Sequence, residues 1–185
     1  MNVLEWPNRK ARIWRGELPP VCCTTGAVLR ADIPVPPVAS HSPRQAAIEL
    51  SVHLGPRFQY GLLGAEYTPG GHDTLSIVVA TSAPASPVYE GALYAGGGVT
   101  RNGIHPEYGP AILSECSTPG GQWTLGPGIL RFQIGAHNDV ASSQAAFARL
   151  TRMLLQLLQP DTDTLCTDGL RELVASVWRQ QGAQI

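Results

Sequence analysis

The chain of 185 residues contains one lysine, Lys10, and its 13 basic residues face 14 acidic ones. A net charge of −1 excludes a protein whose whole surface attracts nucleic acid. No apolar run is long enough to cross a bilayer, and no apolar segment with a cleavage site is found near the first residues. No G-x-x-x-x-G-K-[ST] loop is present, so no cradle for a nucleoside triphosphate is expected.

Metal-binding patterns are also absent from the sequence. The four cysteines form no C-x-x-C pair, and the five histidines show no H-x-x-x-H or H-E-x-x-H spacing. We therefore expect free thiols, no metal site, no cofactor and a cytoplasmic location with no membrane contact. The cysteines are Cys22, Cys23, Cys116 and Cys166.

Hydrophobic residues make up 43% of the chain and charged residues 15%, which is typical of a folded protein. The length suits one domain with short additions. We expect an N-terminal arm at residues 1–25, a main domain at 26–160, and a C-terminal helix at 161–185 that packs on the same domain.

Basic and aromatic residues alternate in the arm. Such a segment can clamp phosphates and stack bases. The alternative is a strand or hairpin whose tryptophans point inward and whose arginines face water. The residues concerned are Trp6, Arg9, Lys10, Arg12, Trp14 and Arg15.

Apolar periodicity predicts the remaining elements. Strands are predicted at residues 27–35, 57–67, 74–82, 88–96 and 128–136, and helices at 43–54, 106–116, 147–158 and 168–180. A turn is predicted at residues 117–122. Strands mixed with helices in this order indicate an α+β two-layer sandwich.

Three blocks of the sequence resemble domain IV of elongation factor G. GPRFQYGLLGAEYTP (residues 55–69) fits the pattern G-x-R-x-Q-Y-G-x-x-x-x-E-[FY]-x-P. GGVTRNGIHPEYGPAI (residues 97–112) is similar to G-G-V followed by E-Y-x-P-A-[VI], with a few extra residues between the two parts. HNDVASSQAAF (residues 137–147) looks like H-D-V-D-S-S-E-x-A-F. The blocks keep the order of that family within residues 27–158.

The resemblance implies a ribosomal protein S5 domain 2-like fold, with a mixed sheet and helices on one face. It also implies that the loops around residues 56–59 and 137–139 meet at one tip that reaches RNA. The binding residues expected at this tip are Arg57, Gln59, His137, Asn138 and Asp139.

The chain departs from the family in two respects. The GTPase part is missing, so the chain is not a complete translocase. The family's capping Asp and Glu are replaced by Ala141 and Gln144, so Ser142 or Asp139 is expected to cap the following helix.

Three functions fit these observations. The first is a stand-alone, non-GTPase binding module whose tip loops contact RNA, the ribosome or a protein partner. The second is a small-molecule enzyme that reuses the fold, with His137 and Asp139 in acid–base chemistry. The third is a structural or interaction subunit that uses its last two helices. The oligomeric state stays open.

Overall fold

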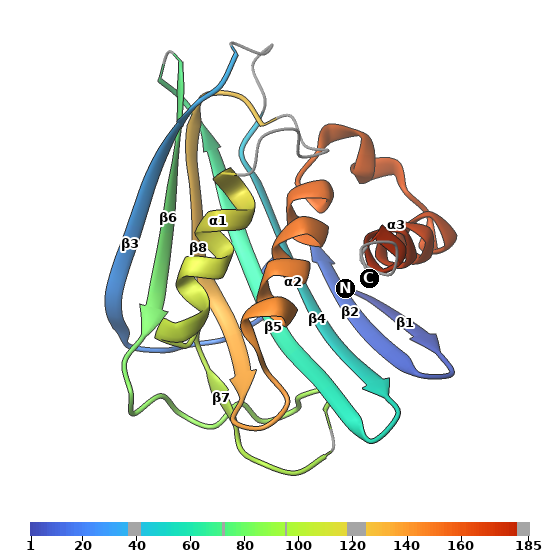
Figure 1. Ribbon diagram of the computed structural model, residues 1–185. Coiled ribbons are helices and arrows are strands. Elements are labelled where there is room, and N and C mark those ends of the chain that lie inside the picture. Colours follow the sequence, from blue (N-terminus) through green and yellow to red (C-terminus); the bar gives the residue numbers. More distant parts are fainter. Residues whose placement is uncertain (37–41, 72, 95, 118–124, 181–185) are drawn as a thin grey trace.

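The computed structural model describes residues 1–36, 42–71, 73–94, 96–117 and 125–180 (Figure 1). Its strands are β1 (Asn2–Trp6), β2 (Arg9–Arg15), β3 (Thr25–Pro34), β4 (Arg44–Leu54), β5 (Arg57–Pro69), β6 (Thr74–Ser82), β7 (Thr100–Asn102) and β8 (Gly128–Asn138). Its helices are α1 (Gly109–Ser117), α2 (Gln144–Leu157) and α3 (Thr167–Gln180), with short 3₁₀ turns at Pro106–Tyr108 and Pro160–Thr164.

The strands form one sheet in the order β1-β2-β4-β5-β8-β6-β3, and β7 pairs with the end of β8. Neighbouring strands are antiparallel except β6 and β8, which run parallel. A parallel pair needs a crossover connection, and α1 lies on the segment that joins these two strands.

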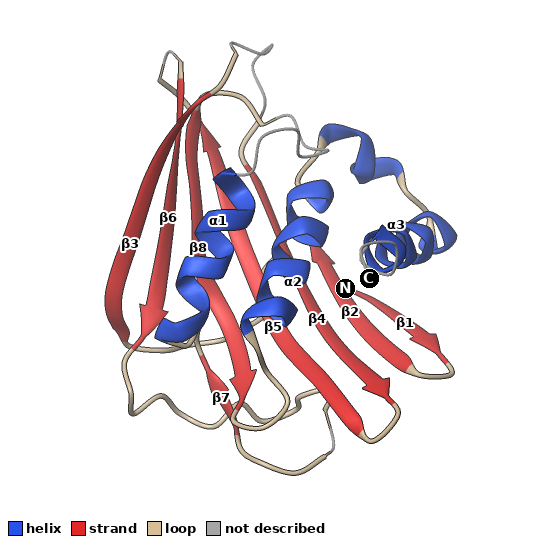
Figure 2. Ribbon diagram, in the orientation of Figure 1, coloured by secondary structure: helices blue, strands red, loops and turns tan. Residues whose placement is uncertain are grey.

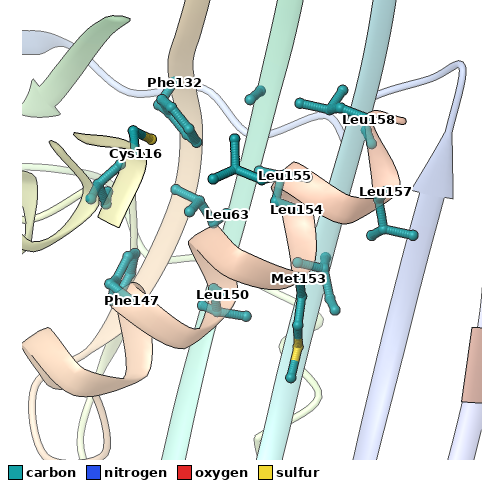
Figure 3. Close-up of a cluster of buried hydrophobic side chains, with 14 of the residues drawn as sticks. Leu63, Cys116, Phe132, Phe147, Leu150, Met153, Leu154, Leu155, Leu157 and Leu158 are labelled. Carbon is teal, nitrogen blue, oxygen red and sulfur yellow. The ribbon is translucent and has the colours of Figure 1, made fainter. Parts of the chain in front are cut away.

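The three helices of the described residues lie on one face of the sheet (Figure 2). Their apolar sides pack against the strands beneath them and form the main core. In α2 the apolar side chains of Phe147, Leu150 and Leu154 are buried near Leu63 of β5 (Figure 3). The expected α+β class is therefore confirmed, as a mixed sheet under one layer of helices.

Part of the opposite face of the sheet is covered by irregular chain rather than by helices. We call residues 83–94 and 96–99 the strap. Tyr89 of the strap packs against a second core cluster that includes Trp14, Ala47 and Leu62. The Arg12 guanidinium donates to the Gly91 carbonyl oxygen at 2.7 Å and holds the strap against β2.

The helix predicted at residues 43–54 is wrong, because this segment forms β4. β4 lies between β2 and β5, and every residue from Ala46 to Val52 is buried. A strand buried on both faces shows no alternation of apolar and polar residues, so its apolar spacing also fits a helix.

The strand predicted at residues 88–96 is also wrong. Its described residues belong to the strap, where Val88 makes an isolated bridge to Arg101. The other predicted strands correspond to β3, β5, β6 and β8, and the other predicted helices to α1, α2 and α3. Apart from Ser117, the turn predicted at residues 117–122 lies outside the described residues.

The N-terminal residues form the β1–β2 hairpin, which continues the sheet beside β4. Trp14 is buried on the strap side, and Trp6 is half-buried. α3 packs on α2 and β1. The first and last segments of the chain therefore meet at the same edge of the molecule (Figure 1).

Candidate functional site

The two loops named from the sequence lie at the same end of the sheet. We call this region the distal end, made of the β4–β5 hairpin (residues 53–58), residues 98–101 and the β8–α2 loop (residues 137–143). Gly55 turns the hairpin with a φ of +63°, a conformation that glycine adopts readily. Two hydrogen bonds join the β8–α2 loop to β5 next to the hairpin: Tyr60 N–H donates to the Ala141 oxygen at 3.0 Å, and Ser142 Oγ donates to the Tyr60 oxygen at 2.8 Å.

Two of the five expected binding residues are exposed at the distal end. The Arg57 side chain is exposed to solvent. Asp139 is also exposed, with its Oδ1 3.9 Å from Nε of Arg101. Both side chains can therefore reach a partner.

Gln59 is half-buried and accepts a hydrogen bond from the Arg149 guanidinium on α2 at 2.5 Å. This contact fixes the start of β5 against α2. The side-chain amide of Gln59 is therefore already hydrogen bonded within the protein. It can bind a partner through this oxygen only if the hydrogen bond from Arg149 breaks.

Asn138 is fully buried and shapes the loop instead of facing outward. Its Oδ1 accepts from the backbone N–H groups of Val140 and Ala141 at 3.0 and 2.9 Å. Its Nδ2 donates to Thr100 Oγ1 at 3.1 Å. All of these are internal bonds, so the structure gives Asn138 a role in loop geometry.

His137 is only 4% exposed and points into the layer between sheet and helices. Its Nδ1 lies 3.0 Å from the Gly103 carbonyl oxygen, which can only accept, so Nδ1 carries the proton. Its ring packs beside His105 at 5.2 Å and Tyr108 at 6.1 Å between centroids. Burial lowers the pKa of His137, which favours the neutral imidazole.

The expected acid–base pair is therefore not assembled. His137 and Asp139 interact electrostatically, but the Nδ1 hydrogen of His137 is committed to Gly103, and Asp139 faces Arg101. A general base must reach the proton that it removes. The buried ring of His137 offers no such approach in this conformation.

The cap of α2 is Ser143, not Ser142 or Asp139 as expected. Ser143 Oγ accepts from the Ala146 N–H at 3.2 Å. Ser142 instead accepts from the Asn138 N–H at 2.8 Å and donates to β5. Ser143 thus caps the helix, and Ser142 holds the loop against β5.

Exposed apolar side chains gather at the distal end, a feature that the sequence did not reveal. Val140 is 73% exposed and lies beside Gly98, and Phe58 is 36% exposed. Leu54 and Val99 are exposed as well. Apolar side chains grouped with Arg57 are typical of a contact surface rather than of a solvated loop.

Two cavities lie elsewhere on the described part of the chain. One of about 480 Å³ lies where β4 and β5 approach the end of α2, with Arg15, Arg44, Glu66 and Asp163 in its lining. The other, of about 350 Å³, lies on the strap side next to the distal end. The sequence showed no signal for either, because their linings come from segments far apart in the chain.

The described residues contain no group of three His, Cys, Asp or Glu side chains placed to hold a metal ion. The four cysteines are free thiols, and burial raises the pKa of Cys116. Within the same residues, no helix has the length and apolar character needed to cross a membrane.

Comparison with known proteins found no family model, no curated protein and no solved structure that matches the chain.

Proposed function

We propose that the chain is a stand-alone, non-GTPase binding module of the elongation factor G domain IV kind, with a ribosomal protein S5 domain 2-like fold. Its distal end contacts RNA, such as the RNA of the ribosome. The three sequence blocks support this proposal, because two of them lie side by side at the distal end through the bonds between Tyr60, Ala141 and Ser142.

One observation carries the proposal: the distal end presents Arg57, Phe58 and Val140 to solvent. These residues lie on the β4–β5 hairpin and the β8–α2 loop, and buried residues stabilise both segments. A guanidinium binds phosphate, and an exposed aromatic ring stacks on an unpaired base. The buried His137 and Asn138 hold this surface in shape. The geometry therefore favours recognition over catalysis.

The balanced charge of the chain sets the expected strength of binding. Phosphate contacts supply much of the affinity for RNA, and few arginines lie at the distal end. We expect weak association that depends modestly on salt concentration. Arg57 should contribute about one unit to the slope of the logarithm of the binding constant against the logarithm of salt concentration.

The test is co-sedimentation of the purified chain with ribosomes and with separated subunits at low and high salt. Arg57→Ala should weaken association several-fold and lower the salt slope by about one. Arg171→Ala, at an exposed position on α3, is the matched control and should behave like the wild type. Salt-insensitive association, or none at any salt concentration, would overturn the proposal in favour of a protein partner.

A further inference from the structure

The cavity of about 350 Å³ lies between the β1–β2 turn, the ends of β4 and β5, and the strap. Its lining includes Lys10, Ser51, His53, Phe58 and Leu93. Its volume falls within the range of small-molecule sites, about 300–1,000 Å³. Phe58 also belongs to the distal end, so the cavity opens beside the surface proposed above.

Ser51 gives the cavity a polar group. Its neighbours Leu50 and Val52 face the helices, so Ser51 points to the strap side of β4. The residue is 3% exposed, and it lines the cavity. A hydroxyl that borders a cavity can donate a hydrogen bond to a ligand or accept one from it.

Aromatic rings form one wall of the cavity. The His53 and Phe58 rings meet edge to face with centroids 4.3 Å apart, and Phe58 contacts Tyr94 of the strap at 5.5 Å. Tyr94 in turn lies 5.8 Å from the buried Tyr60. The wall is thereby fixed, and the exposed part of Phe58 is free to stack on a planar group.

Lys10 places a positive charge at the cavity. Its ammonium nitrogen is 3.2 Å from a Glu5 oxygen, and both side chains are mostly exposed. Exposed ion pairs of this kind contribute little to stability. An anionic ligand can therefore replace Glu5 as the partner of Lys10 at small cost.

A hydrogen bond to a buried residue also fixes the strap beside the cavity. The backbone N–H of Leu93 donates to the buried Glu49 carboxylate at 2.8 Å, which fixes the strap where it borders the cavity. A preformed wall spares the ligand the cost of ordering the strap.

We propose that this cavity binds one nucleotide unit, with its base against Phe58, a base edge hydrogen bonded to the Ser51 hydroxyl, and its phosphate on Lys10. Stacking, base-edge hydrogen bonds and phosphate contacts are the three means by which proteins hold unpaired bases. The inference rests on the proposed function and deepens it: an RNA strand that crosses the distal end would insert one unstacked base here. A free nucleoside monophosphate offers the same chemistry.

Calorimetric titration with each of the four ribonucleoside 5′-monophosphates, and with single-stranded eight-residue ribo-oligonucleotides, tests the proposal and separates the two sources. We expect the oligonucleotide to bind more tightly than the monophosphate, because it also reaches Arg57. Ser51→Leu, which fills the cavity, should weaken both by about tenfold. Lys10→Gln should weaken the binding of the monophosphates and oligonucleotides, and it should leave unchanged the binding of the four unphosphorylated ribonucleosides, titrated in parallel.

Arg171→Gln is the control for a lost positive charge, and the melting temperature of each variant verifies its fold. If Ser51→Leu fails to fold, Lys10→Gln decides, since its side chain is exposed. Absence of binding by any nucleotide at millimolar concentration, or equal binding by Lys10→Gln and wild type, overturns the inference. Ribosome association that survives Lys10→Gln and Ser51→Leu, but not Arg57→Ala, would show that this inference alone has failed.

Discussion

Glu49 lies fully buried in β4 and connects the strap to the sheet. Its carboxylate accepts from the Tyr60 hydroxyl at 2.9 Å, the Leu93 N–H at 2.8 Å and the Arg12 guanidinium at 3.3 Å. Burial raises the pKa of Glu49, and these three donors oppose the rise. A buried carboxylate is tolerated only where such donors surround it.

Glu49→Ala should therefore lower the free energy of unfolding by about 2–5 kcal/mol, because Tyr60 and Leu93 lose the acceptor of buried hydrogen bonds. Denaturant unfolding measures the change. Tyr60→Phe should cost about 1 kcal/mol, since Glu49 keeps its other donors. Glu5→Ala, at a mostly exposed position, should stay within about 0.5 kcal/mol of the wild type, and an equal loss at Glu5 and Glu49 would contradict this assignment.

At the residue scale, much of the family-like block in β5 is explained by packing. Tyr60 binds Glu49, and the Tyr67 hydroxyl donates to the Pro127 oxygen. A Cβ on Gly61 would lie 2.7 Å from Leu150 Cδ1 of α2, so a larger residue would push the helix side chains aside. These residues stabilise the fold, whereas Arg57 and Phe58 near the start of the block are exposed and can contact a partner.

At the scale of elements, α2 begins where the distal end finishes, so its cap links the fold to the proposed surface. Ser143 has an extended backbone, and its hydroxyl satisfies the Ala146 N–H. This geometry places the first turn of α2 directly after the loop that carries Val140.

Ser143→Ala should destabilise the protein by about 1 kcal/mol through loss of the cap. Ser143→Asp should restore the stability, since aspartate caps equally well and its charge suits a helix N-terminus. Thermal unfolding of the two variants provides the comparison. A Ser143→Asp variant as unstable as Ser143→Ala would show that the hydroxyl serves another purpose.

The elements also show how far sequence patterns reach. Apolar periodicity and the turn residues that bound each segment predicted β3, β5, β6 and β8. β4 was predicted as a helix because both of its faces are covered, one by α2 and the other by the strap, so that its apolar spacing also fits a helix. The inward direction of the His137 side chain could not be predicted from the sequence either. It depends on contacts with Gly103, His105 and Tyr108, which lie in a separate segment.

At the scale of the whole molecule, one core joins the two ends of the chain. Leu4 and Ala11 of the first hairpin belong to the same buried cluster as Leu170 and Val174 of α3. The sheet itself runs without interruption from β1 to β3. The buried residues of the N-terminal hairpin therefore belong to the same core as those of the central strands.

We expect this molecule to unfold in a single cooperative step. In a Trp123→Phe/Trp178→Phe variant, tryptophan fluorescence reports only Trp6 and Trp14 of the β1–β2 hairpin, whereas far-ultraviolet circular dichroism reports the whole chain. The two signals should change at the same denaturant concentration. An earlier change in fluorescence would mean that the hairpin detaches before the remainder unfolds.

Lys10 is a site at which the chain can be modified selectively. Amine-reactive reagents can modify only Lys10 and the amino terminus, and the amino terminus is paired with Glu17. A short amine-directed crosslinker would thus join a bound partner at a known place beside the 350 Å³ cavity. Because lysine is so scarce, a captured molecule can be attached only at Lys10 or at the amino terminus, two sites that peptide mapping distinguishes.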